Sequence, residues 1–206
     1  MRSNSFGYSG YWDTISFQDG VFYVTWRGSS KYLTSSDGIN WSKNNILDST
    51  YAPIVANWYK LIINNGIKYL FIKTGPYYYT ESGGVWTQRS FPTYVDIAGV
   101  DVSTDIYVLP KTGKTLYKVV PNGAISITLD SEGSSWNSLS VNSGKLYLGG
   151  DISAEYVVSN GTLTNLPYFT NCLDLKAYNN IILGASTSGT LASINGVNYI
   201  LDTSYN

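Results

Sequence analysis

The residues of this sequence that could support acid–base chemistry are carboxylates. Four aspartates, Asp13, Asp96, Asp101 and Asp174, fall near the starts of segments that we expect to be inner strands of a repeated unit. Glycoside hydrolysis needs two positioned carboxylates, one as acid and the other as base or nucleophile. Solvated or hydrogen-bonded structural aspartates account for the same pattern. A glycosidase is therefore the least favoured of the functions considered.

The chain lacks the residues that other common catalytic sites and metal sites require. The chain contains no histidine, which excludes a Ser-His-Asp triad, a Cys-His dyad and histidine metal sites. Cys172 is the single cysteine, so neither an internal disulfide nor a cysteine zinc site can form. We expect a buried structural thiol there. The sequence thus predicts no catalytic residues, no metal, no cofactor and a protein that is not an enzyme.

The side chains suited to binding are aromatic rings beside short polar groups. The chain has 19 Tyr and 6 Trp. Such rings stack on the C–H faces of sugars, while amides and hydroxyls bond to sugar hydroxyls. The candidate glycan-binding residues, all in expected loops, are Arg27, Tyr51, Tyr77, Tyr94, Trp136 and Tyr168. For Trp136, as for Trp12 and Trp58, packing between repeated units is the interpretation that we favour.

A repeated pattern of turns and strands would position these residues. The first turn of each repeat is Asp19-Gly20, Asn65-Gly66, Thr104-Asp105, Ser143-Gly144 and Asn179-Asn180. Apolar residues stand five and three positions before the second turn residue, as Ile15 and Phe17 do, which fits a strand with one buried face. A second hairpin turn follows at Asp37-Gly38, Gly83-Gly84, Asn122-Gly123, Asn160-Gly161 and Asn195-Gly196. Such pairs supply the positive φ values that two-residue hairpin turns require.

The spacing of the repeats predicts the fold. The second-hairpin glycines advance by 46, 39, 38 and 35 residues, and about forty residues with four short strands is one propeller blade. We predict an all-β, five-bladed β-propeller with four antiparallel strands per blade. It would be a single domain over 1–206, with blades at about 12–47, 54–92, 94–131, 134–167 and 170–204. Residues 1–11 would form an N-terminal arm.

Composition limits the expected partners. Charged residues make up 13% of the chain and the net charge is −1, which gives no electrostatic footprint for nucleic acid or an anionic membrane. No apolar run has the length of a membrane span, and the first 25 residues lack the apolar core of a signal peptide. We expect synthesis in a cytoplasm and no membrane insertion.

One turn carries a family resemblance. The stretch Ser35-Ser-Asp37-Gly38-Ile-Asn-Trp41 resembles the Asp-box, or BNR, turn of sialidase-like propellers, although the usual residue between Asp and Gly is missing. In that family the turn is a folding element, which implies structural roles for Asp37, Gly38 and Trp41. Sialidase activity is not implied, because three arginines bind the substrate there. The three arginines of this chain, Arg2, Arg27 and Arg89, are not expected to converge.

The chain from about 12 to 204 is similar to small five-bladed propellers, namely tachylectin-type lectins and propeller domains of bacteriophage receptor-binding proteins. The resemblance rests on blade count, the Asp37 turn and the Tyr-, Asn-, Ser- and Gly-rich composition. It implies a non-enzymatic module of a phage tail or fibre that binds a host cell-surface glycan or receptor, alongside other virion subunits. The alternatives are a stand-alone sugar-binding lectin and a structural protein–protein docking module.

Overall fold

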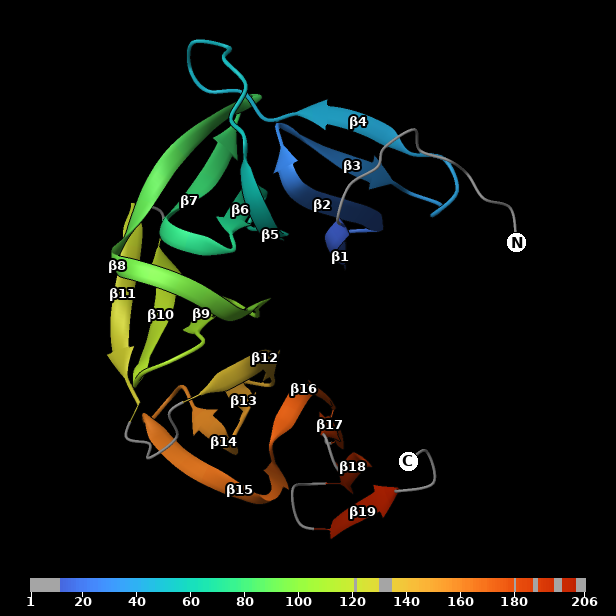
Figure 1. The fold of residues 1–206 in the computed structure, drawn as a ribbon, viewed down its shortest axis with the longest axis vertical. Helices are drawn as coiled ribbons and strands as arrows, with labels where there is room; N and C mark the ends of the chain where they lie inside the picture. Colours follow the sequence, from blue (N-terminus) through green and yellow to red (C-terminus); the bar gives the residue numbers. More distant parts are fainter. Residues whose placement is uncertain are drawn as a thin grey trace. The chain divides into compact units, whose positions relative to one another are not determined.

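The structure, a computed structural model, describes residues 12–120, 122–129, 135–179, 181–186, 189–194 and 198–202. The regular elements of this part of the chain are all β-strands (Figure 1). The all-β class is therefore as predicted, whereas the expected arm at 1–11 lies outside the described residues. Among the described residues, no helix is long and apolar enough to cross a membrane.

The strands follow one another as antiparallel meanders (Figure 1), of which the first three are hydrogen-bonded into one 11-stranded sheet and the fourth and fifth are separate four-stranded sheets. The first contains β1 (Trp12–Gln18), β2 (Val21–Ser29), β3 (Lys31–Ser35) and β4 (Ser42–Asn45). The second contains β5 (Ala56–Asn64), β6 (Ile67–Ile72), β7 (Thr74–Ser82) and the start of β8 (Val85–Val102). The third contains the rest of β8, β9 (Ile106–Pro110), β10 (Thr115–Val120) and β11 (Gly123–Thr128). The fourth contains β12 (Trp136–Asn142), β13 (Lys145–Gly150), β14 (Ile152–Val157) and β15 (Thr162–Thr170). The fifth contains β16 (Cys172–Tyr178), β17 (Ile181–Ser186), β18 (Gly189–Ile194) and β19 (Asn198–Asp202).

One predicted blade boundary is not a break in the chain. The sequence suggested a connection at 92–94, but β8 runs for 18 residues through that point. Pro92 lacks a backbone N–H and fits an extended edge segment. The outer strand of the second meander thus passes without a turn into the first strand of the third.

The chain divides into two compact units, Met1–Lys73 with Tyr77–Arg89, and Thr74–Pro76 with Ser90–Asn206. The core of the first unit contains Tyr23, Tyr32, Ile46, Trp58, Leu61, Leu70 and Trp86. The second unit has one core around Leu109, Leu116, Trp136, Leu139 and Leu148, and another around Tyr147, Phe169, Cys172 and Leu175. Full burial of one such large apolar side chain contributes about 1.5–3 kcal/mol, so packing between meanders is a main source of stability.

Every first strand carries an irregularity at the same repeat position. The pairing register with the second strand shifts between Trp12 and Thr14 in β1, and at the matching place in β5, β8, β12 and β16. The extra residue is Asp13, Tyr59, Ala98, Asn137 or Leu173. Bulges bend a strand and re-aim side chains, often beside functional sites. We call the end of each meander that contains this residue the bulge end.

Candidate functional site

The bulge end of the first meander holds an ion pair. Arg27, near the end of β2, donates from Nε to Asp13 Oδ1 across 2.8 Å. The side chain of Asp13 is 12% exposed and that of Arg27 is 56% exposed. The carboxylate therefore anchors one edge of the guanidinium, and much of the Arg27 side chain still reaches solvent.

The bulge end of the second meander places a cation on an aromatic ring. Lys73 follows β6, and its Nζ lies 4.3 Å from the centroid of the Tyr59 ring. The Lys73 backbone N–H donates to the carbonyl of Asn57 across 2.8 Å. A cation–π contact of this kind is worth about 0.5–1 kcal/mol at an exposed site, so it orients the lysine without burying its charge.

Two contacts bring these bulge ends together within the first unit. Arg27 lies opposite Asn57 in the β2–β5 pairing, and Thr14 Oγ1 donates to the carbonyl of Tyr59. We call Asp13, Arg27, Asn57, Tyr59 and Lys73 the Arg27–Lys73 cluster. It joins two cations, one carboxylate, one amide and one phenol ring, so its formal charge is positive.

Two aromatic candidates, Tyr51 and Tyr77, belong to the same unit as this cluster. Tyr51 is 76% exposed in the loop before β5, with a φ of 62°. Asp48 fixes this loop: bonds from the Thr50 hydroxyl and from the N–H groups of Ala52 and Thr50 lower the pKa of its carboxyl. Tyr77 is 38% exposed near the start of β7, one residue before the Tyr78 that pairs with β6.

The remaining predicted binding residues lie in the second unit or outside the described side chains. Tyr94 is 70% exposed on β8. Tyr168 falls in β15, and its side chain lies outside the described part of the structure. Trp136 is only 1% exposed, and its indole Nε1 donates to the carbonyl of Gly113 across 3.1 Å. Its place among the glycan-binding candidates is therefore wrong, because it is a core residue of the fourth meander.

The third meander repeats the ion pair of the first. Lys111 Nζ lies 3.1 Å from Asp96 Oδ2, and the Lys111 N–H donates to the Asp96 carbonyl. Asp13 Oδ2 and Asp96 Oδ1 are each buried without a hydrogen bond from the described residues. Unsatisfied buried acceptors are uncommon and cost free energy. The unsatisfied carboxylate oxygens at the bulge ends of the first and third meanders therefore lower the stability of the fold.

The Asp37 turn is held by its own side chains. Asp37 Oδ1 accepts bonds from the N–H groups of Asn40 and Ile39 at 2.7 and 2.8 Å, and these bonds lower the pKa of Asp37 well below its usual range. Gly38 has a φ of 71°, and its carbonyl accepts a bond from Trp41 Nε1. These contacts are those of a structural turn.

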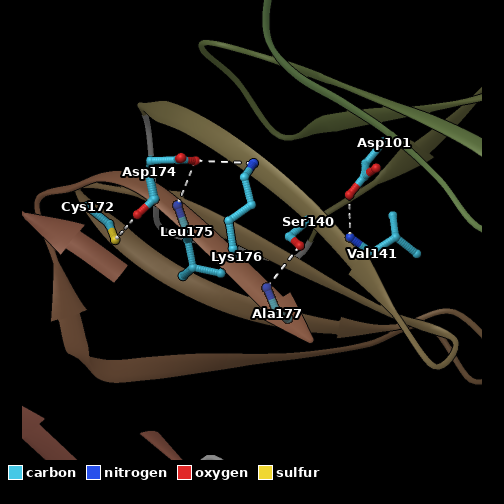
Figure 2. Close-up of polar contacts among 8 residues, drawn as sticks. All are labelled: Asp101, Ser140, Val141, Cys172, Asp174, Leu175, Lys176 and Ala177. Carbon is cyan, nitrogen blue, oxygen red and sulfur yellow. Dashed lines mark hydrogen bonds and ion pairs between the residues drawn. The ribbon is translucent and has the colours of Figure 1, made fainter. Parts of the chain in front are cut away.

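The inner strands of the second unit are joined by side-chain bonds to backbone. Figure 2 shows Asp101 of β8 accepting a bond from the N–H of Val141 in β12, at 2.9 Å. Ser140 of β12 accepts a bond from the N–H of Ala177 in β16, at 3.0 Å. In the first unit, Ser16 of β1 donates to the carbonyl of Leu61 in β5 across 2.7 Å. The inner-strand polar residues thus link successive meanders.

Asp174, the fourth candidate carboxylate, is also engaged. Its Oδ1 accepts a hydrogen bond from the N–H of Leu175 at 3.0 Å and forms an ion pair with Lys176 Nζ at 3.3 Å (Figure 2). The Cys172 thiol donates to the Asp174 carbonyl, and burial raises the pKa of this thiol. Because Asp13, Asp96 and Asp101 also have partners, the structure assigns each of the four carboxylates a local contact.

A separate apolar hollow lies on the first meander. It has a volume of about 250 Å³ and is lined by Trp12, Val24, Leu33 and Trp41. These side chains offer almost no hydrogen-bonding surface, so the hollow does not suit a sugar. On the same face of β1, Ile15 is 61% exposed and Phe17 is 58% exposed, which makes this an apolar surface of the kind that proteins usually cover.

The fold is similar to that of known propeller proteins. Virginiamycin B lyase from Staphylococcus aureus, crystallised as a catalytically inactive histidine-to-alanine variant with quinupristin, matches with a TM-score of 0.74 at 12% identity, over 97% of this chain and 71% of that one. YCF48 bound to a D1 peptide matches with a TM-score of 0.67 at 18% identity, over 95% and 67%. A chain of the nidogen/laminin complex matches with a TM-score of 0.68 at 10% identity, over 95% and 82%. No family model and no curated sequence matches the chain.

These similarities confirm the β-propeller fold, while closure into five blades stays a prediction. They also correct the expectation that the protein is not an enzyme. That expectation is contradicted, because propellers of similar fold include enzymes, namely virginiamycin B lyase and streptogramin B lyase. At these identities the similarity establishes the fold alone.

Sequence reasoning missed part of the cluster. The sequence marks Arg27 as a binding candidate, but it marks Asp13 only as a candidate acid–base carboxylate and gives no role to Tyr59 or Lys73. A signal was present: Arg27 and Lys73 each stand seven residues after the glycine of the first turn, Gly20 or Gly66. Aligning the ends of the second strands would have paired the two cations.

Proposed function

We propose that the protein is a glycan-binding module whose site is the Arg27–Lys73 cluster with Tyr51 and Tyr77. The observation that carries the proposal is the convergence of polar groups on two neighbouring bulge ends, in a unit that also presents the exposed rings of Tyr51 and Tyr77. Tyr51 and Tyr77 offer faces for stacking on sugar C–H groups. The guanidinium of Arg27 and the amide of Asn57 offer donors and an acceptor for hydroxyls.

The cluster suits an extended, polar ligand better than a deep-pocket one. Its side chains come from the ends of strands and from one loop, so they are presented at the end of the sheet and not in a deep pocket. The partners that hold them, Asp13 for Arg27 and Tyr59 for Lys73, restrict their motion before any ligand arrives. Such pre-organisation lowers the entropic cost of binding.

The proposed setting is a virion, on a bacteriophage tail or fibre that contacts the host cell surface. Its support is compositional: a chain with few charges, no histidine and one cysteine, rich in Tyr, Asn, Ser and Gly. A stand-alone lectin uses the same site and differs only in setting. Sedimentation of the protein with virus particles supports the virion, and its absence from purified particles contradicts it.

A second candidate function is protein docking, and the apolar face of the first meander favours it. Ile15, Phe17 and Ile39 are each more than half exposed around the hollow at Trp12 and Trp41. Two of the similar propellers were solved with protein or peptide partners, YCF48 with a D1 peptide and nidogen with laminin. A docking module would hold a partner chain here and show no affinity for sugars.

The experiment is a binding survey of the purified, labelled protein against bacterial cells and isolated surface polysaccharides. Products of the same mixtures are analysed, because lyases share this fold. Saturable binding to at least one polysaccharide is expected. Binding to a partner protein and to no polysaccharide would overturn the glycan proposal and favour docking.

A further inference from the structure

We infer that the ligand of this site is an acidic glycan, in which a sugar carboxylate is bound between Arg27 and Lys73. This inference rests on the proposed glycan-binding function and names the class of sugar. The two cations lie on either side of β5 in one unit, since Arg27 is paired with Asn57 and the Lys73 N–H is bonded to the Asn57 carbonyl. A ligand lying over Asn57 therefore meets both.

The charge balance of the cluster favours an anion. Asp13 is the single carboxylate among its members and bonds to Arg27 through Nε. The terminal nitrogens of the guanidinium are then directed to other partners, and more than half of the side chain is exposed. A guanidinium matches the planar geometry of a carboxylate, whereas an ammonium acts as a point charge.

Tyr59 gives the second cation a defined position. Lys73 Nζ sits 4.3 Å from the ring centroid, and the Thr14 bond to the Tyr59 carbonyl ties this residue to β1. Lys73 is therefore held at the strand end rather than sampling solvent on a flexible stem. With Arg27 it frames a site for one carboxylate.

The third meander contains an ion pair that can serve as a control for the Arg27–Asp13 pair. Lys111 and Asp96 form the same kind of ion pair at the bulge end, but the bulge residue there is Ala98 rather than tyrosine. Removing the Lys111 charge thus reproduces the loss of an ion pair without touching the cluster. A variant without the Lys111 charge therefore separates effects on folding from effects on ligand binding.

The test uses acidic polysaccharides with their carboxyl-reduced forms, in which each carboxylate has become a neutral alcohol. The probes are oligogalacturonate, oligoalginate, hyaluronan and polysialic acid, measured by biolayer interferometry on the full chain. Binding of at least one acidic probe is expected, with affinity lowered about tenfold or more by carboxyl reduction, since one charge-assisted contact has about that effect. Arg27→Gln and Lys73→Gln should each weaken binding of the acidic form by a similar factor. Lys111→Gln should leave it unchanged.

Two results overturn the inference in distinguishable ways. The first is equal binding of the acidic and reduced forms, or unchanged affinity in Arg27→Gln and Lys73→Gln. It would mean that a glycan binds without a contact between its carboxylate and these two cations, and the proposed glycan-binding function would stand. Binding of no acidic or neutral probe removes the proposed function as well. Because Arg27→Gln leaves Asp13 unpaired, the Asp13→Asn/Arg27→Gln double variant is measured in parallel. Retained tight binding by that folded variant also overturns the inference.

Discussion

The carboxylate of Asp101 accepts a hydrogen bond from the backbone N–H of Val141, 2.9 Å away and 40 residues further along the chain. Its other oxygen accepts the N–H of Val102. A residue that the sequence marks as a candidate catalytic acid thus joins the first strands of two successive meanders. Ser140 performs the same task between the next two.

Asp101→Ala should destabilise the protein by about 1–3 kcal/mol, because two N–H groups lose a charged acceptor. Ser140→Ala should cost less, about 0.5–1.5 kcal/mol, because a neutral acceptor is lost from one N–H. Urea unfolding followed by fluorescence measures both. If Asp101→Ala leaves the midpoint unchanged, the bond does not hold the two strands together.

Gly99→Ala adds only one methyl group, but it should strongly destabilise the protein. A Cβ at Gly99 would lie 2.5 Å from Leu139 Cβ and 2.6 Å from the Leu139 backbone nitrogen, so neighbouring strands must separate. Overpacking of this kind costs about 1–3 kcal/mol or more. Gly123→Ala is the control, because no atom of the described residues lies within 4 Å of the position that its Cβ would take. Equal melting temperatures for the two variants would mean that the strands are further apart than the structure has them.

The Asp37 turn should make stability depend on pH at the acid end. Hydrogen bonds lower the folded-state pKa of Asp37, so the unfolded chain binds a proton first as pH falls. The stabilisation is complete above the ordinary Asp pKa of about 3.9 and is lost as pH drops below it. Melting curves of wild type and Asp37→Asn between pH 7 and pH 2 should converge on acidification. Curves that stay parallel would contradict the role of the charge.

Ionisation of two buried tyrosines should lower the stability of the folded protein at alkaline pH. Burial, chiefly, raises the pKa of Tyr78 and of Tyr147 to about 12, from an ordinary value of 10.0. Between those values the unfolded chain releases protons that the folded chain keeps, so stability is lost as pH rises from 10 towards 12. The Tyr78→Phe variant should lose less stability than wild type over that interval. An identical slope in the two proteins would show that Tyr78 ionises as freely when folded as when unfolded.

The fold was predictable because its signals are local and repeated. Turn pairs such as Asn65-Gly66 and alternating apolar residues such as Leu61 and Ile63 specify strand and turn at each step. The continuous β8 was not predictable, since Pro92 in a short polar stretch is also typical of a loop. Trp136 illustrates a further limit: its type suits both a core and a sugar site, and only its burial decides between them.

The site was harder to predict because it depends on contacts between repeats. Tyr51 and Tyr77 stand out in the sequence as exposed aromatic residues. The pairing of Arg27 with Asp13 follows from the bulge, which has no sequence signature of its own. Lys73 joins them through the β2–β5 pairing, which exists only after the first two meanders have docked.

The most direct test of the central claim is the dissociation constant of the Tyr51→Ala/Tyr77→Ala variant for a polysaccharide that the wild-type protein binds. Tyr178→Ala is the control, because Tyr178 is as exposed as Tyr51, at 76%, but lies on β16 in the other unit. Loss of two stacking contacts should weaken binding at least about tenfold, at about 1–3 kcal/mol per aromatic–ligand contact by analogy with base stacking, with no change in melting temperature. Tyr178→Ala should bind as wild type does. Unchanged affinity in the double variant, or an equal loss in Tyr178→Ala, would contradict a glycan site at the bulge ends of the first two meanders.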